Sequence, residues 1–327
     1  MSDFSARSGP GGGPPPRLLV AGSQLRVDVV TAEVVDALRA AGVEPVLLKG
    51  PTIARWLYDE PAERPYADTD LLVPPGAAGR VGDVLGSMGF RPFSRPVGSR
   101  GPAAATAWLR DDRTSVDVHV TLIGANVPPE RVWEVLSAET EPWSVARTTV
   151  AALRPPARAL HVVLHSAQHG RDWDGPRRDV EQAVARLPRP VWVEAARVAR
   201  DLDATPALAA GLLIAPGGAE LVSALGLPPP DRADVLLRAG NAPPLAVGID
   251  WLTRSEGAGR RAAYVARRVF PTPSEMRRWT PLARRGPVGL ALAYVLRPFW
   301  LVAKLPAALR ALRDARVRAA GSRERER

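Results

Sequence analysis

The sequence predicts a small α/β domain followed by an all-helical domain. In the first half, the apolar run VLL after Pro45 and the alternating segment Ser115–Leu122 are typical of strands. Segments between them have apolar residues at helical spacing. After Pro128 the chain is a run of helices punctuated by Pro and Gly, apart from one short strand near Thr148–Leu153. At 327 residues the chain is long enough to bury a core and to form two domains.

Composition divides the chain further. Residues 1–16 (MSDFSARSGPGGGPPP) are rich in Gly, Pro and Ser, which predicts a disordered leader. We place the domain boundary at ArgProProAla, residues 154–157. The expected parts are a leader at 1–16, an α/β domain at 17–154, a helical domain at 155–286 and a basic helical tail at 287–327. The leader lacks the basic-then-apolar pattern of a signal peptide, so we expect a cytoplasmic protein.

Each element of the α/β domain is predicted from its own pattern, in chain order. Thr31–Ala41 has apolar residues at helical spacing, with Thr31 as N-cap and Gly42 just past the end. A short helix at Thr52–Tyr58 begins after Pro51. The remaining predicted elements are a strand at Thr69–Val73, a helix at Gly76–Met88, and strands at Ala105–Leu109 and Ser115–Leu122.

Two aspartates, Asp68 and Asp70, are the strongest indication of a site. Residues two apart on a strand point to the same face, so these carboxylates lie side by side and need a cation between them. The chain has two other D-x-D pairs, but both lie in or beside helical stretches, where residues two apart do not share a face. With Asp117 from another strand as third carboxylate, the pattern predicts a site for one or two Mg²⁺ ions. The alternative is a solvated strand edge.

The turn before these aspartates carries Lys49 and Gly50. Arginine is used almost throughout this chain, and Lys49 and Lys304 are its only lysines. A compact ammonium can contact phosphate where a planar guanidinium does not fit, so Lys49 and Gly50 are predicted phosphate contacts; the alternative is a surface lysine. Arg64, four residues before the first aspartate, is positioned to pair with a phosphate or with Asp68.

All four histidines fall near these motifs. His119 shares a strand face with Asp117, so we expect it to line the pocket. His161, His165 and His169 recur every four residues and form one stripe of a helix. The H-x-x-x-H spacing is compatible with zinc, but no H-E-x-x-H glutamate and no cysteine accompany it. The simpler interpretation is a polar stripe that packs against the first domain.

Together, these motifs resemble those of the uncharacterised nucleotidyltransferase family within the polymerase-β-like superfamily. The resemblance rests on LLKG, a helix containing LY, R-x-x-x-D-x-D-L-L-V, V-D-V-H, and later LHVVLHSAQHG with RRDVEQAV, and it covers residues 17 to 280. It implies a nucleotidyltransferase-like catalytic domain with a small mixed sheet. It also implies that Gly50 lies in the phosphate turn, that the metal ligands are Asp68, Asp70 and Asp117, and that His165 and His169 face the cleft with support from Asp179. The superfamily's Gly-Ser turn is here Lys-Gly-Pro, without the serine.

The implied activity is Mg²⁺-dependent transfer of a nucleoside monophosphate from an NTP to an unidentified acceptor, with release of pyrophosphate. The acceptor class stays open: a small molecule, a saccharide, a peptide or a protein. The alternative is a catalytically inactive nucleotide-sensing or partner-binding module on the same fold. Nucleic-acid binding is not favoured, because the net charge of +10 lies largely in Arg-rich segments from Arg260 onward and lacks interleaved aromatic residues.

The basic tail allows two interpretations. Val288–Leu296 is apolar on all sides but stops at Arg297, and a membrane span needs about 20 apolar residues, so a single crossing is not expected. The segment that follows mixes apolar and basic residues. It is either an interfacial helix that makes peripheral contact with an anionic membrane or a terminal helix that covers the core. We favour the second.

Overall fold

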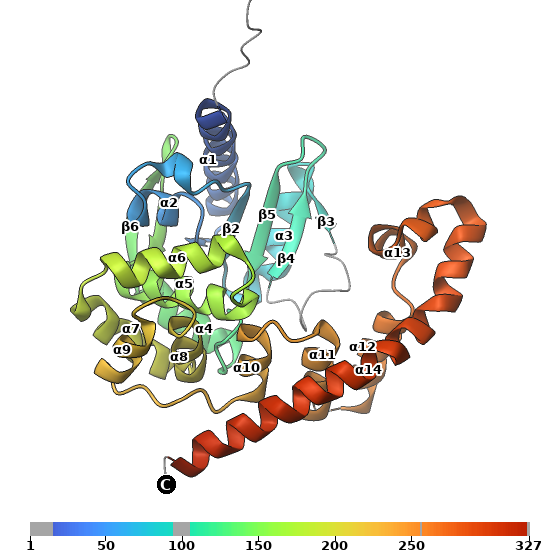
Figure 1. The fold of residues 1–327 in the computed structure, drawn as a ribbon. Coiled ribbons are helices and arrows are strands. Elements are labelled where there is room, and N and C mark those ends of the chain that lie inside the picture. The colour runs from blue at the N-terminus through green and yellow to red at the C-terminus, as the bar shows by residue number, and fades with distance from the viewer. Residues whose placement is uncertain (1–15, 94–104, 256, 326–327) are drawn as a thin grey trace, which may run out of the picture.

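The computed structural model describes residues 16–93, 105–255 and 257–325. Within these residues, a mixed seven-stranded sheet forms the N-terminal part and helices form most of the rest (Figure 1). The strands follow the spatial order β3-β4-β5-β2-β1-β7-β6. Their bounds are β1 Val46–Leu47, β2 Asp68–Leu72, β3 Arg91–Phe93, β4 Ala105–Leu109, β5 Ser115–His119, β6 Thr140–Val145 and β7 Thr148–Leu153. β2 pairs in parallel with β5, and β1 with β7, while the other pairs are antiparallel.

The mixed sheet and the helical region after it confirm the predicted fold class. Two strands were missed, β3 and β6, so the prediction that the chain after Pro128 holds only one strand is wrong at Thr140–Val145. Both are edge strands of the sheet, and each contains a proline, Pro92 or Pro142. Proline is tolerated at a sheet edge but weakens the strand pattern in a sequence, which explains the omission. The strand expected to reach Leu122 ends at His119.

The N-terminal helix α1 is longer than predicted. It spans Pro16–Ala40, so the helix does not begin at Thr31 and the predicted N-cap is wrong. Thr31 is buried inside α1, where its hydroxyl donates to the carbonyl of Val27 and lies 2.8 Å from it. The same hydroxyl lies 2.7 Å from the hydroxyl of Thr69 on β2 and ties the helix to the sheet. The predicted disordered leader falls outside the described residues, except for Pro16.

Helices cover both faces of the sheet, and the strands alternate between two cores. On one face, α1 and α3 (Ala78–Ser87) pack over residues such as Leu71 and Val118. On the other face, α2 (Pro51–Leu57), α4 (Pro129–Ala138) and α5 (Pro155–His169) share a core that includes Leu72. Because alternate residues of a strand share a face, Asp70 lies on the same side as Leu72, toward α5.

The helical region continues this second core. The core that contains Leu72 also includes Leu160 of α5 and Trp192 of α7, so it crosses the predicted boundary at 154–157, where α5 begins. The remaining helices are α6 Asp174–Arg186, α7 Arg189–Asp201, α8 Thr205–Leu212, α9 Gly218–Ala224, α10 Ala233–Ala239, α11 Pro244–Arg254, α12 Ala258–Val269, α13 Pro273–Trp279 and α14 Gly286–Arg325. Short 3-10 turns are η1 Pro61–Glu63, η2 Pro75–Ala77 and η3 Pro281–Arg284.

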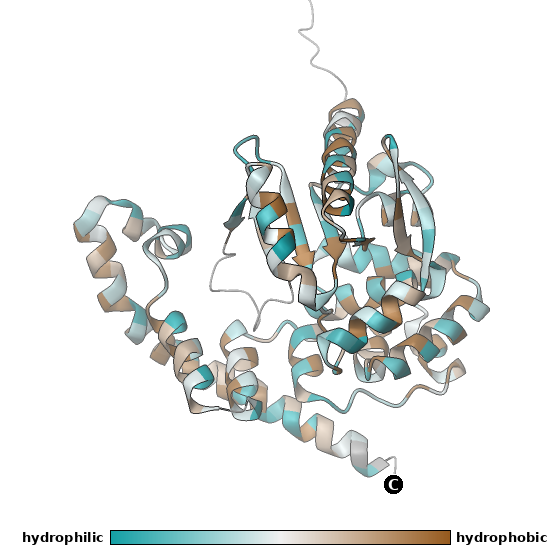
Figure 2. Ribbon diagram, turned by 180° about the vertical axis from the view of Figure 1, so that it is seen from behind, coloured by the Kyte–Doolittle hydropathy of each residue, from teal (hydrophilic) through white to brown (hydrophobic). Residues whose placement is uncertain are grey.

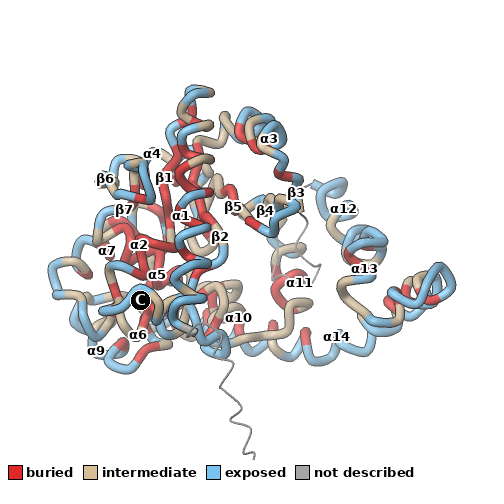
Figure 3. The backbone as a smooth tube through the Cα atoms, turned by 90° about the horizontal axis from the view of Figure 1, so that it is seen from above, coloured by how far each residue is buried: buried red, intermediate tan, exposed pale blue. Residues whose placement is uncertain are grey.

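An arm, residues 257–305, projects from the helical part and comprises α12, α13, η3 and the first half of α14 (Figure 1). Most of its residues are exposed, in contrast to the buried central strands β1 and β2 (Figure 3). Hydrophobic residues alternate with hydrophilic ones along it (Figure 2). The preferred prediction, a tail that covers the core, therefore holds only for the second half of α14, where Ala308, Leu312 and Ala315 are buried in a core shared with α10 and α11.

Candidate functional site

Two buried aspartates face each other across neighbouring strands. Asp70 on β2 is the register partner of Asp117 on β5, and Leu72 is the partner of His119. Asp117 and His119 are two residues apart and therefore share the face on which Asp70 lies. Asp70, Asp117 and His119 each offer one ligand atom, and these atoms lie within 4.8 Å of one another. In the described part of the chain, these two carboxylates and one imidazole form the group that could hold a metal ion.

The membership of this group differs from the predicted ligand set. Asp68 occupies the first position of β2 and is only partly buried, and it lies outside the group of three. Its charge acts instead on Lys49, whose pKa it raises together with Asp70. His119, which was expected to line the pocket, is the third member of the group. The V-D-V-H alternation carried this information, since it places His119 and Asp117 on one strand face.

Lys49 is directed at Asp70. Strand β1 ends at Leu47, the backbone N–H of Leu48 donates to the carbonyl of Asp70, and the Lys49 Nζ then lies 3.1 Å from Asp70 Oδ2. Burial alone would lower the pKa of the Lys49 ammonium, but the charges of Asp70 and Asp68 outweigh it and raise that pKa. Lys49 therefore stays charged at neutral pH. The predicted phosphate contact is, in this structure, the counter-ion of the buried carboxylate.

The second oxygen of Asp70 contacts His119, with 3.1 Å between Oδ1 and Nε2. Burial would raise the pKa of Asp70, but the charge of Lys49 and the hydrogen bond with His119 hold it well below its ordinary value. Asp70 is therefore ionised at neutral pH. Both of its oxygens have a cationic or imidazole neighbour, so the carboxylate is compensated without any added ion.

The turn after Lys49 is built around glycine. Gly50 has φ +81°, a conformation that glycine adopts without strain, and a Cβ at this position would meet the ring of Tyr66 at 3.4 Å. Pro51 follows as the first residue of α2. The hydroxyl of Thr52 is buried and donates to the carbonyl of Leu48, 3.3 Å away. The turn thus provides no free side-chain hydroxyl in the place where the superfamily has a serine.

Arg64 and Asp179 form a second buried ion pair. The Arg64 guanidinium donates through Nε and Nη2 to the carboxylate of Asp179 on α6, with a shortest distance of 2.8 Å. Tyr58 donates to the same carboxylate at 2.8 Å. The sequence pattern predicted a phosphate or Asp68 as the partner of Arg64. The family resemblance implied that Asp179 supports the histidines of α5. The structure instead joins these two residues, which are 115 positions apart.

The three histidines of α5 lie along one stripe, as predicted. The ring centroids of His165 and His169 are 4.6 Å apart, those of His161 and His165 are 6.2 Å apart, and Trp173 lies 4.9 Å beyond His169. Burial, followed by the charges of His119 and Lys49, lowers the pKa of His161 to about 3. Burial and the charge of Lys49 also lower the pKa of His165 well below its ordinary value. Both imidazoles are therefore neutral, and both lie close enough to Lys49 for its charge to act on them.

The comparison with protein families agrees with the sequence motifs. Residues 17–216 match the family described as uncharacterised nucleotidyltransferase. The fold is also similar to the crystal structure of an antigenic nucleotidyltransferase-like protein from Paracoccidioides brasiliensis, with a TM-score of 0.34 and 14% sequence identity, over 57% of this chain and 93% of that chain. No curated protein matches this sequence.

Proposed function

Because this chain belongs to the uncharacterised nucleotidyltransferase family, we propose that it moves a nucleoside monophosphate from an NTP to an acceptor, with Mg²⁺ as cofactor and pyrophosphate as product. The observation that carries the proposal is the pair Asp70 and Asp117, which are buried opposite each other on β2 and β5 beside His119. Buried carboxylates at this separation are arranged for a divalent cation.

The residues present fit such an ion. The two carboxylates are oxygen donors of the kind that Mg²⁺ and Mn²⁺ prefer, and Asp70 is ionised at neutral pH. His119 adds an imidazole, a donor more typical of transition metals. An ion at Asp70 competes with the Lys49 ammonium for Oδ2, since Lys49 lies 3.1 Å from that oxygen. When bound, the cation supplies charge neutralisation for the triphosphate.

The chain's own residues supply the remaining parts of the reaction. Lys49, displaced from Asp70, turns its ammonium to a phosphate oxygen of the nucleotide. Arg64 adds positive charge nearby, since its charge acts on Lys49. Asp117 takes the proton from the acceptor hydroxyl while the hydroxyl oxygen forms a bond to the α-phosphorus. The bond between that phosphorus and the bridging oxygen breaks, and its electrons leave with pyrophosphate.

A second candidate function is a nucleotide-sensing or partner-binding module without catalysis. Two observations favour it. The Lys49 and Asp70 pair already balances the buried charge. In addition, Pro51 follows Gly50 where the resemblance implies a serine, and the hydroxyl of the next residue, Thr52, bonds the backbone. Such a protein would bind nucleotide through Lys49 and Gly50 but transfer nothing.

The test is label transfer from α-labelled NTPs to a panel of small-molecule, saccharide, peptide and protein acceptors, with Mg²⁺ or Mn²⁺. We expect Asp70→Asn and Asp117→Asn to lower transfer at least about a hundredfold. Asp172→Asn is the matched control, because Asp172 belongs to an exposed D-x-D pair outside the site. Equal transfer by wild type and Asp70→Asn would refute the site. Nucleotide binding without transfer to any acceptor would favour the sensing module.

A further inference from the structure

The first half of α14 exposes an apolar stripe. Its five members recur three or four residues apart and therefore lie on one face of the helix. They are Val288, Leu292, Val295, Phe299 and Val302, with exposed fractions of 73%, 49%, 60%, 70% and 67%. Leu296 and Trp300 widen the stripe, at 53% and 41% exposed. From Val288 to Val302 the stripe runs for about 20 Å. It is thus a continuous apolar patch, whereas an ordinary protein surface has apolar residues scattered singly.

The opposite face of the same half-helix is packed. Ala293 shares a small core with Met276 of α13 and Ala283 of η3. Arg297 is 2% exposed, donates from Nε to the carbonyl of Arg268 at 2.9 Å, and stacks over the ring of Trp279 at 4.4 Å. The helix is therefore two-sided: one side is fixed to the arm, and the stripe is left facing outward.

The arm and the tail also carry the chain's positive charge. Residues 257–327 contain 17 Arg and Lys against 4 Asp and Glu, while the whole chain has a net charge of +10. The remainder of the chain is thus slightly acidic. Arg284 and Arg285 lie exposed directly before α14, and Lys304 lies 6.0 Å from the ring of Trp300 near the end of the stripe. Cations flanking an exposed apolar face complement a surface that is both apolar and anionic.

We propose that the arm binds the surface of a membrane that contains anionic lipids, with α14 lying in the interfacial layer and its apolar stripe directed into the acyl chains. α14 is long and apolar enough to cross a bilayer by length and composition. A crossing, however, would place Arg297 and the packed α13 in hydrocarbon. An in-plane helix keeps those contacts and inserts only the stripe, so the two-sided packing favours surface binding.

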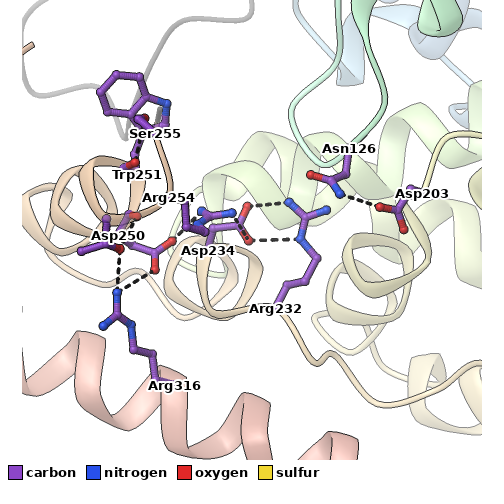
Figure 4. A network of polar contacts seen from close by, with 10 residues as sticks. Asn126, Asp203, Arg232, Asp234, Asp250, Trp251, Arg254, Ser255 and Arg316 are labelled. Carbon is purple, nitrogen blue, oxygen red and sulfur yellow. Dashed lines mark hydrogen bonds and ion pairs between the residues drawn. The ribbon is translucent and has the colours of Figure 1, made fainter. Parts of the chain in front are cut away.

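The second half of α14 joins the arm to the body. Arg316 lies 3.5 Å from Asp250 of α11 and donates to the hydroxyl of Thr253 at 2.7 Å (Figure 4). Asp250 also pairs with Arg254, which reaches Asp234 of α10. A membrane-bound arm therefore holds the whole protein at the surface. Deleting the tail would uncover α10 and α11, so point variants in the stripe are the better test.

The experiment is co-sedimentation of the full chain with vesicles of phosphatidylcholine, alone or mixed with phosphatidylglycerol. We expect binding to the mixed vesicles that weakens as salt is added. Val295→Asp/Phe299→Asp should reduce binding at least about tenfold. Val193→Asp/Leu213→Asp, at positions 47% and 43% exposed on the helical body, is the matched control and should bind like wild type. Circular dichroism shows whether each variant is folded.

Four results would overturn the proposal. One is absence of binding to both vesicle types, and another is equal binding by the folded stripe variant. The third is retention of the reconstituted protein in the bilayer after an alkaline carbonate wash, which would mean that α14 crosses the membrane. The fourth is a wild-type protein that forms a dimer and does not bind vesicles, while the stripe variant stays monomeric. A second copy of this chain would then be the partner.

The charge contribution is tested separately. Substituting Arg284→Gln/Arg285→Gln should weaken binding to the mixed vesicles about fivefold or more.

Discussion

The Lys49 ammonium lies 3.1 Å from the buried Oδ2 of Asp70, a carboxylate that also belongs to the group of three potential metal ligands. This contact joins the two residues that the sequence assigned to different tasks, one to phosphate and the other to metal. It also makes the charge balance of the site testable without any knowledge of the acceptor.

Replacing Lys49 by methionine should destabilise the protein and make it dependent on divalent cations. The variant leaves Asp70 as a buried carboxylate without its main counter-charge, which costs about 3 kcal/mol of unfolding free energy. Mg²⁺ or Mn²⁺ should then raise the melting temperature of Lys49→Met more than that of wild type. Lys304→Met, which changes the chain's other lysine at an exposed position, should leave the melting temperature in solution nearly unchanged. Equal cation responses in all three proteins would contradict a metal position at Asp70.

The buried histidines should make stability depend on mildly acidic pH. The pKa of His161 is lowered to about 3 in the folded protein, against an ordinary value of about 6.5. Between these values the unfolded chain binds a proton that the folded protein does not, so stability is complete above about pH 6.5 and falls as the pH drops. The loss approaches about 1.4 kcal/mol per pH unit for this residue.

Urea unfolding from about pH 7.5 to about pH 5 measures this slope. His161→Gln should flatten it relative to wild type. Part of the slope should persist, because the pKa of His165 is lowered by burial as well. Identical slopes for the two proteins would show that His161 is not held neutral in the folded state.

The pair Arg64 and Asp179 should stabilise the contact between the sheet domain and α6. Both side chains are largely buried, at 15% and 3% exposed, so Asp179→Ala leaves Arg64 and Tyr58 without their acceptor and should cost about 3 to 5 kcal/mol. Arg64→Leu/Asp179→Leu should recover part of that loss, because no unpaired charge remains. Chemical denaturation measures both. Disrupting the exposed pair of Arg186 and Asp59 should change stability little and serves as control.

The conformation of Gly50 should be sensitive to any side chain. Its backbone conformation, φ +81° and ψ −117°, disfavours other residues, and a Cβ would touch the Tyr66 ring at 3.4 Å, so Gly50→Ala should lower the unfolding free energy by about 1 to 2 kcal/mol. Gly226→Ala is the matched control, since Gly226 also has positive φ but open space around its Cα. A thermal melt compares the two. If both variants lose the same stability, backbone strain alone explains the effect and the contact with Tyr66 adds nothing.

Local sequence patterns were enough to predict which polar side chains share a face of a single strand or helix. The strand context of Asp70 and the alternation of Asp117 with His119 are enough to place three polar groups on two strands. The four-residue spacing on α5 likewise predicts one histidine stripe. The mixed sheet followed from the family resemblance, and the helical region from its Pro and Gly spacing.

Pairings between distant elements could not be predicted in the same way. Lys49 reaches Asp70 because β1 pairs with β2 in a particular register, and no pattern in either segment specifies that register. Arg64 and Asp179 are joined only through the packing of α6 on the site. Prolines obscured the strand patterns of β3 and β6. The first half of α1 has no regular apolar face, since Leu18, Leu19 and Leu25 are exposed. Tertiary contacts decided each of these.

The core shared by Leu72 and Leu160 has a mechanical consequence. Because α5 is joined to the sheet through continuous apolar packing, we expect the histidine stripe to keep its position relative to the carboxylates. We expect no large rotation between sheet and helices when a ligand binds, and the site will be reached by local rearrangements such as the release of Lys49.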